Sequence, residues 1–472
     1  MKAGVKMTNA QMETAINKAR TFHLYIEEAE VLKVASGVYK IYIIERRENN
    51  LDILIPDNVE VIQYVKSGLI EKLLKANNNA SNTLIGHVRV YGGRSLISGF
   101  NNLFSLLQAE IIELDLDNPI KAEVEGDTDT NMGLKDIVAK EFVVHNLAIP
   151  RQYADYCFNQ YGNSVKTIKY KAEKLIIENL TFDTRVLHYC FGGVQVNNLE
   201  IYNLNIPDVS WIHGLFKNCK VENLKIRKFN INYNIITGIS IDKMFSESKI
   251  KNLDISDIGL KHVKHITEAF ESSKIDNIHI DGIDTSETEN MSKLFARAII
   301  SGELDLRWMN TQHLMIASEI FSYCDAKEVI GLDAFCTSNI SKADSMFCWA
   351  SIKNLDLGNW DMPKIHSAKQ MFMGIRPQKF VLPNMMYNSI IRAEEMFKQC
   401  RVDALDLTRM SVSSDATMNR IFESCRASII KMPNVHINKS ANAYCAFLDC
   451  DSALECNDES LKKVSEVRTP YV

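Results

Sequence analysis

Apolar and polar positions recur along most of the chain with a fixed period that is marked by phenylalanine. Successive marker phenylalanines lie 25 or 26 residues apart, with one interval of 29. They are Phe191, Phe216, Phe245, Phe270, Phe295, Phe321, Phe347, Phe372, Phe397, Phe422 and Phe447. A constant period of this length predicts a solenoid, in which each repeat completes its core by stacking on its neighbours.

Each repeat is predicted to contain a strand and a short helix. Apolar residues return five, eight and ten positions after the phenylalanine, as Ile352, Leu355 and Leu357 do in "SIKNLDLGN". This alternation is typical of a half-buried strand. The segment that leads to the next phenylalanine, such as "KIHSAKQMF", spaces its apolar residues by three and four, which predicts two helical turns. The predicted fold class is therefore α/β, with a parallel sheet on one face and short helices on the other.

The pattern divides the chain into four regions. Regular repeats are predicted for 191–450, and degenerate repeats for 84–190, where "LFSLLQAEIIELDLDN" has the same phenylalanine-then-strand form. Residues 1–83 differ, because "NAQMETAINKAR" and "VEVIQYVKSGLIEKLLKA" predict helices and "GVYKIYIIERRENNLDILIPDN" predicts two strands around a polar turn. We expect a small α+β domain there, either an N-terminal cap or a second partner-binding module. The polar segment 451–472 is expected to be a C-terminal cap.

The repeats resemble those of the BspA-like leucine-rich-repeat family, which also occur in mycoplasma surface lipoproteins. The segments "MFCWASIKNLDLGNWDMPKIHSAKQMF" and "IHIDGIDTSETENMSKLF" carry the resemblance, which extends over about residues 190 to 450. It implies a right-handed leucine-rich-repeat solenoid that displays a surface for partners, and many relatives look like adhesins at a cell surface. This chain departs from them, since it shows no leader, lipobox or wall anchor, and keeps the Asp-Thr-Ser turn only at 284–286.

Composition adds constraints on location and partners. The 54 basic and 59 acidic residues give a formal net charge of −5, so the chain has no strong overall field to attract nucleic acid or a membrane surface. No apolar run is long enough to predict a membrane span. The 11 cysteines are odd in number and include no paired CxxC set, which favours reduced thiols in a cytoplasm. We therefore expect a cytoplasmic protein, and the type of repeat fits a bacterial or phage origin.

Catalytic signatures are absent from the sequence. It contains no Gly-rich phosphate loop, no HExxH motif and no Gly-x-Ser-x-Gly elbow. We expect a protein that is not an enzyme and that has no catalytic residues, no cofactor and no metal site.

The spacing of the cysteines favours a structural role for them over a metal site. Small residues occupy the place three after most of the marker phenylalanines, with cysteine at Cys219, Cys324, Cys400, Cys425 and Cys450 and with serine or alanine at Ser248, Ser273, Ala298 and Ala350. A position shared by these types predicts tight packing around a buried thiol. A disulfide or metal site among the last three cysteines is the alternative.

One candidate binding surface is the outward-facing middle of the predicted strands. Acidic residues and one histidine recur there, at Asp254, His279, Asp305, Asp356 and Asp406. They either satisfy local hydrogen bonds within each repeat or form a surface for a basic partner. In both cases the carboxylates oppose phosphate, which makes nucleic acid an improbable partner on this face.

A second candidate surface follows the marker phenylalanines by two residues. This position is mostly polar, and Arg297 is one of its polar residues. In the next two repeats it holds Tyr323 and Trp349 instead. Exposed aromatics beside arginine are typical of an interface hot spot, although both rings could instead fold onto their own loops. Trp308 is a related case, because a one-residue insertion gives the buried position to Met309 and leaves the tryptophan outside.

These observations favour a non-enzymatic protein-binding scaffold inside the cell, such as an adaptor, inhibitor or assembly subunit. A rigid repeat surface suits this role because it loses little entropy on docking. A surface or host-contact adhesin of the BspA-like kind is the second candidate. A nucleotide- or nucleic-acid-binding module is the third.

Overall fold

The chain folds as a parallel β-solenoid of about 12 turns with very few helices. The computed structural model describes residues 28–33, 39–47, 50–54, 85–91, 108–115, 137–149, 151–160, 168, 170–206, 209–231, 238–387, 389–436 and 443–466. Two compact units are present, an N-terminal unit of Met1–Asp208 with Leu224–Asn232 and a C-terminal unit of Val209–Asn223 with Tyr233–Val472. Each unit is described by itself below.

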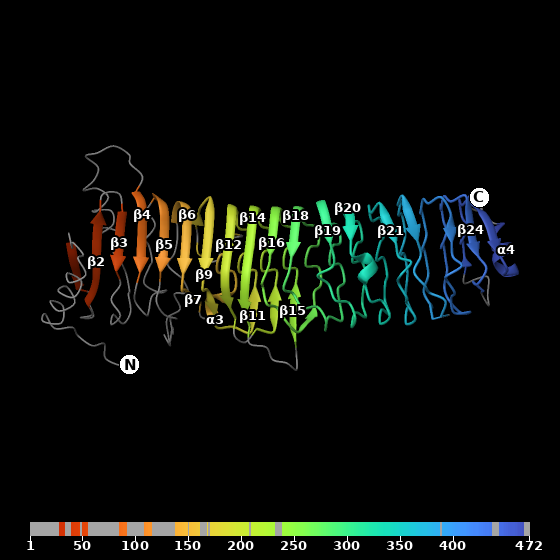
Figure 1. The fold of residues 1–472 in the computed structure, drawn as a ribbon, viewed down its shortest axis with the longest axis horizontal. Coiled ribbons are helices and arrows are strands. Elements are labelled where there is room, and N and C mark those ends of the chain that lie inside the picture. The colour runs from red at the N-terminus through yellow and green to blue at the C-terminus, as the bar shows by residue number, and fades with distance from the viewer. Residues whose placement is uncertain are drawn as a thin grey trace. The chain divides into compact units, whose positions relative to one another are not determined.

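The N-terminal unit begins with antiparallel strands and continues with parallel ones (Figure 1). The antiparallel strands are β1 (Glu28–Lys33), β2 (Tyr39–Arg47) and β3 (Asn50–Leu54). The parallel strands that follow β3 are β4 (Ile85–Tyr91), β5 (Gln108–Asp115), β6 (Ile137–His145), β9 (Lys174–Glu178) and β12 (Gln195–Asn205). Short elements complete the unit: β7 (Ala148–Ile149), α3 (Arg151–Ala154), β8 (Tyr170–Lys171), β10 (Thr181–Phe182) and β11 (Val186–His188).

The two strands predicted around a polar turn correspond to β2 and β3, which pair with Arg47 opposite Asn50. The helices predicted at 9–20 and 59–76 lie outside the described residues, so the α+β character of this region stays a prediction. Asparagine side chains link turns farther along the same unit: Asn179 Nδ2 donates to Asn146 Oδ1 at 3.0 Å, and Asn203 Nδ2 donates to Asn179 Oδ1 at 2.9 Å. All three asparagines have φ near +55°, a conformation that asparagine adopts more readily than most residues.

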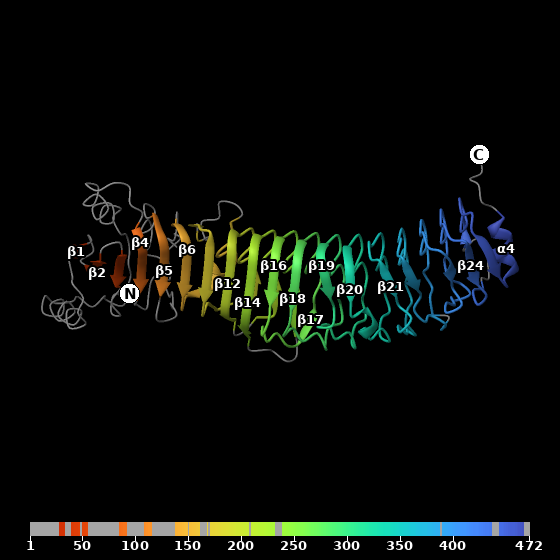
Figure 2. The same ribbon diagram turned by 45° about the horizontal axis from the view of Figure 1, so that its top comes forward.

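The C-terminal unit pairs the strands of successive turns in parallel (Figures 1 and 2). The main ladder contains β16 (Lys249–Ile255), β18 (Lys274–Ile280), β19 (Ile299–Asp305) and β20 (Asp325–Ile330). A second ladder contains β13 (Trp211–His213), β15 (Ile239–Asp242) and β17 (Val263–His265). Later pairs are β21 (Asn354–Asp356) with β22 (Lys379–Val381), then β23 (Leu405–Asp406), β24 (Ile429–Met432) and β25 (Ala453–Cys456). Strand β14 (Lys220–Asn230) is divided between the two units at Leu224.

Helices are short in the C-terminal unit. A 3-10 turn, η2 (Leu332–Ala334), follows β20, and α4 (Glu459–Ser465) follows β25. The Asp458 side chain caps α4 by accepting a hydrogen bond from Leu461 N at 2.9 Å, and Leu461 is fully buried. None of the helices in the described part of the chain has the length and hydropathy that a helical bilayer crossing requires.

The marker phenylalanines form the centre of the core, as predicted. From Phe216 to Phe447 each ring is at most 2% exposed. Neighbouring rings are stacked, with centroids 5.1 to 5.8 Å apart. Offset stacking at this distance is favourable beyond the burial of the rings alone, so the column fixes the register of successive turns.

The prediction of short helices on the second face is wrong for the described residues. Phe245 N donates to Ala269 O of the next turn at 2.7 Å, whereas a helix would direct this N–H to a carbonyl four residues back. The flanking residues Lys243 and Glu247 have φ of 54° and 60°, in the left-handed region. Alternate N–H groups are thus committed to the neighbouring turn. A chain that turns tightly in this way also returns apolar side chains to the core after three or four residues, which explains the helix-like spacing.

The small position three after each phenylalanine is buried, as predicted. All cysteines are free thiols, and Cys219, Cys324, Cys400, Cys425 and Cys450 are fully buried. Burial raises the pKa of the Cys324 thiol to about 12. Because the thiolate is the reactive form, these cysteines should be inert near neutral pH in the folded protein.

Alkylation at pH 8 is therefore expected to separate two classes of cysteine. Iodoacetamide should modify Cys336, which is exposed, and Cys445, which is half-buried, while Cys324 and Cys425 react only after denaturation. Peptide mass spectrometry at increasing times measures each site. Equal rates for Cys336 and Cys324 in the folded protein would contradict the burial described here.

Candidate binding surface

The residues two after successive phenylalanines form an outward row that we call the aromatic row: Arg297, Tyr323, Trp349 and Gly374. The three non-glycine members have φ of 55° to 56°, so the backbone turns their side chains away from the core. Tyr323 is 52% exposed, the Arg297 side chain is 65% exposed, and Trp349 is half-buried. The row thus brings together three of the predicted site residues.

Each aromatic ring of the row has a guanidinium group beside it. The Arg297 Cζ lies 5.9 Å from the centroid of the Tyr323 ring, and the Arg376 Cζ lies 6.0 Å from that of Trp349. Such cation–π contacts contribute about 0.5–1 kcal/mol at exposed sites. They hold the rings in place and leave positive charge next to each ring.

Trp349 lies over Gly374 of the next turn, which explains why it is only half-buried. A Cβ on Gly374 would come within 2.4 Å of Cδ2 of the indole, and Gly374 also has φ of +72°. Other repeats place a side chain at this position with a similar φ, so the close approach of the indole is what requires glycine here. Neither Gly374 nor Arg376 was recognised from the sequence as part of the site. The available signal was a glycine in a position that carries a side chain in the other repeats from Phe216 to Phe447.

The backbone ladder opens next to Trp349. In the preceding turn Ser351 N donates to Cys324 O at 2.8 Å, and in the following turn Arg401 N donates to Ile375 O at 2.9 Å. No equivalent bond joins Arg376 N to the carbonyl of the preceding turn among the described residues.

A large residue in "GIRPQ" accounts for this opening. Ile375 occupies the buried position that holds cysteine, serine or alanine in the other repeats from Phe216 onward, and it is 1% exposed. Its larger side chain requires more room between the turns. Pairing with the preceding turn resumes at Gln378, whose N–H donates to Lys353 O at 2.7 Å.

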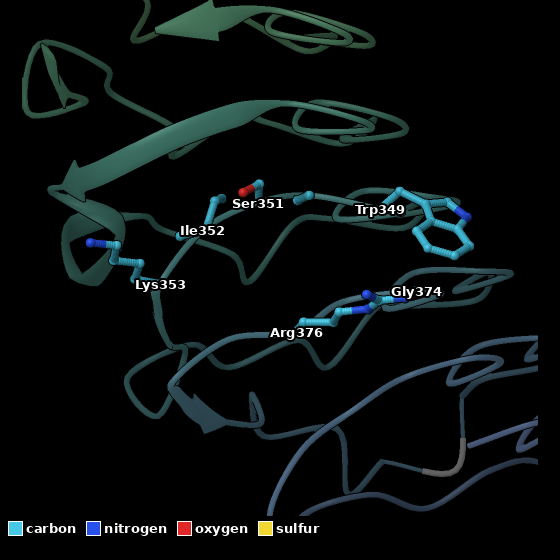
Figure 3. Close-up of a pocket in the computed structure, with 7 residues that line it drawn as sticks. Trp349, Ser351, Ile352, Lys353, Gly374 and Arg376 are labelled. Atoms are coloured by element: carbon cyan, nitrogen blue, oxygen red, sulfur yellow. The ribbon is translucent and has the colours of Figure 1, made fainter. Parts of the chain in front are cut away.

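The opening forms a pocket of about 260 Å³ that we call the Trp349 pocket (Figure 3). It is lined by Trp349, Ala350, Ser351, Ile352, Lys353, Gly374 and Arg376. Figure 3 shows the Arg376 side chain extending toward the indole from the adjacent turn, with Lys353 at the other end. Two cations and one aromatic ring thus line the pocket, and none of its lining residues is acidic.

Comparison with known protein families identifies the family to which the repeats belong. Residues 185–306 and 315–434, more than half of the chain, match the family described as "Mycoplasma protein of unknown function, DUF285". The chain belongs to the DUF285 family. No curated protein and no solved structure matches it. The DUF285 match is consistent with a mycoplasma-type repeat protein, and its description assigns no activity.

The acidic residues that the sequence predicts on the strands of the DUF285 repeats do not follow one another from turn to turn. The register places them opposite residues of other types in neighbouring turns. These partners are His279 for Asp254, Ile330 for Asp305, Val381 for Asp356 and Lys431 for Asp406. Apolar and basic residues therefore lie between the carboxylates along this face of the strands.

Three of these carboxylates are engaged locally. Asp305 receives a two-pronged contact from Arg307, with Nη2 to Oδ2 at 2.6 Å and Nε to Oδ1 at 2.9 Å. Lys379 Nζ lies 2.7 Å from Asp356, and Asp406 accepts the backbone N–H two residues ahead at 2.9 Å. These hydrogen bonds lower the pKa of all three carboxyl groups. Local satisfaction, the first of the two interpretations of this row, agrees with these contacts.

Trp308 lies outside the aromatic row. Met309 takes the buried position, at 6% exposure, as the insertion in this DUF285 repeat predicts. Trp308 itself is half-buried and makes no ring contact with Tyr323 or Trp349 in the part of the chain that the structure describes. Trp308 is therefore not a member of the aromatic row.

Proposed function

We propose that this protein is a non-enzymatic protein-binding scaffold and that the aromatic row is its contact surface. The observation that carries the proposal is the pairing of an exposed tyrosine and a half-buried tryptophan with guanidinium groups on consecutive turns. Tyrosine, tryptophan and arginine are the residues that most often dominate the binding energy of protein interfaces. An adaptor, an inhibitor and an assembly subunit, acting in the cytoplasm, all fit such a surface.

The backbone beneath the aromatic row supports this role. Tyr323 N donates to Cys348 O at 2.7 Å, and Trp349 N donates to Met373 O at 2.7 Å. Each row residue is thereby tied to the following turn of the solenoid. A surface that is already ordered loses little conformational entropy when a partner docks, so more of the contact energy appears as affinity.

Replacing both Tyr323 and Trp349 with alanine is expected to abolish capture of the partner from a lysate of the host. Truncation of a hot-spot residue costs about 2 kcal/mol or more of binding free energy, so two such losses remove a micromolar complex from a pull-down. Circular dichroism should show an unchanged fold, because Tyr323 is exposed and Trp349 is only half-buried. The measurement is quantitative mass spectrometry of the captured proteins.

Tyr444→Ala provides the matched control for this experiment. Tyr444 is 64% exposed and lies outside the aromatic row, so its truncation should leave capture unchanged. A partner that is retained by the double variant, or lost equally with Tyr444→Ala, would rule out the aromatic row as the contact surface.

The second candidate function is that of a surface adhesin related to the BspA-like leucine-rich-repeat proteins. The family match to mycoplasma proteins, together with the Met-Phe and Leu-Asp-Leu segments of the repeats, supports this kinship. Removal of the protein from intact host cells by an added protease would favour this candidate over a cytoplasmic scaffold.

A further inference from the structure

We propose that the Trp349 pocket binds a carboxylate side chain of an acidic peptide segment. The inference rests on the proposed function and names the chemistry of the partner at one point of the surface. It differs from the sequence-based expectation of a basic partner, because apolar and basic residues lie between the carboxylates of that row.

Positive charge in the pocket is available for a ligand. Neither Lys353 nor Arg376 takes part in an ion pair among the described residues, and no carboxylate lines the pocket. The carboxylate of Asp356, on the same turn as Lys353, is instead held by Lys379 at 2.7 Å. A guanidinium group binds a carboxylate through parallel charge-assisted hydrogen bonds, and a lysine nearby adds an attraction of the same sign.

The open ladder adds two backbone groups that suit a peptide. Arg376 N–H and Ala350 C=O have no protein partner in the described part of the chain. Arg376 is exposed and Ala350 is 7% exposed, so the N–H and the carbonyl lie at the rim and the floor of the opening. A carboxylate oxygen can accept from the Arg376 N–H, and a peptide N–H can donate to the Ala350 carbonyl. An inorganic anion satisfies only the first of these groups, whereas a peptide with an acidic side chain satisfies both.

Trp349 selects for a carboxylate that is carried on an apolar stem. The indole is held at one end of the pocket by Gly374 and by the Arg376 guanidinium (Figure 3). The methylene groups of a glutamate can pack on the ring while the carboxylate reaches the guanidinium. A lone phosphate or sulfate offers no such apolar contact.

Fluorescence anisotropy with a fluorescein-labelled octaglutamate peptide tests this proposal on the full chain. The peptide is expected to bind. Octaglutamine has the same size without the charge, and its affinity should be lower by a factor of about ten or more. Arg376→Gln should lower the affinity for octaglutamate about tenfold or more, and Lys353→Gln should lower it less. The affinity should also fall as salt is raised.

Arg401→Gln is the matched control, since Arg401 lies one turn beyond Arg376, is exposed, and has no aromatic ring over it in the described residues. It should change the affinity by less than about twofold. Equal binding of octaglutamine, or an equal loss with Arg401→Gln, overturns the proposal. Binding of an acidic polysaccharide such as alginate, but not of octaglutamate, overturns it as well.

The two proposals can fail separately. If the Tyr323 and Trp349 double variant loses a captured protein while octaglutamate does not bind the wild type, the proposed function stands and the acidic-peptide inference is overturned. If octaglutamate binds in the expected pattern but no captured protein depends on the aromatic row, the pocket chemistry is supported and the scaffold function is overturned.

Discussion

Replacing Phe270 with alanine is expected to lower the free energy of unfolding by about 3–5 kcal/mol. The ring is 2% exposed and stacks on Phe245 at 5.2 Å and on Phe295 at 5.1 Å, so its removal creates a cavity that touches two neighbouring turns. In a solenoid the stability depends on contacts between adjacent turns, and this variant weakens two of them at once. Urea denaturation followed by circular dichroism measures the loss.

Lys274→Ala is the control for this variant, because Lys274 lies on the same turn but is exposed. Its effect should stay within about 0.5 kcal/mol. Hydrogen exchange should locate the damage of Phe270→Ala at the turns on either side. A loss below about 1 kcal/mol, or exchange that accelerates evenly along the chain, would show that the phenylalanine column does not hold the turns together.

Trp360→Ala is expected to destabilise the protein to a similar degree, by about 3–5 kcal/mol. Trp360 is 1% exposed, stacks on Phe335 at 5.6 Å and contacts the Phe347 ring at 5.9 Å. Its Nε1 donates to Leu332 O at 2.6 Å inside the core. Thermal and urea unfolding of the variant measure the combined loss of ring packing and hydrogen bond.

Trp360→Phe separates these two contributions. Phenylalanine keeps an aromatic ring against Phe335 but leaves the Leu332 carbonyl without this donor, which costs about 1–3 kcal/mol. The phenylalanine variant should therefore unfold at an intermediate urea concentration. If it is as unstable as Trp360→Ala, the hydrogen bond rather than ring packing determines stability at this position.

The period, the buried phenylalanines and the small cysteine position could be predicted because they depend on burial. An inward residue must be apolar, and a residue pressed between turns must be small, wherever the backbone directs it. Ile352, Leu355 and Leu357 are buried for the same reason. The burial of these residues could be predicted correctly even though the secondary structure was not, because burial requires only that the side chain returns to the core once per turn.

The short helices could not be distinguished from tight turns by spacing alone. Ile365, Ala368 and Phe372 are all fully buried, at the intervals that a helix would give. What decides between the two conformations is the direction of alternate N–H groups, which depends on the presence of a neighbouring turn. A single repeat does not contain this information.

The candidate site was only partly visible in the sequence. Arg297, Tyr323 and Trp349 could be found because their position recurs with the period. The pocket depends on departures from the period, because Gly374 and Ile375 stand where most repeats carry a side chain and a small residue, respectively. An irregular repeat within a regular series is therefore the signal to search for in chains of this kind.

The inter-turn hydrogen bonds have a consequence for how such a gene can change. Each turn presents the same donors and acceptors on its two sides, as Phe245 N does toward Ala269 and Phe270 N does toward Leu294. Unequal recombination that deletes or duplicates one whole 25-residue segment joins two compatible faces, whereas a shorter deletion does not. The number of repeats can thus change between related genes while the core packing stays the same. The irregular repeat around Trp349 could then be gained, lost or shifted along the solenoid as one unit.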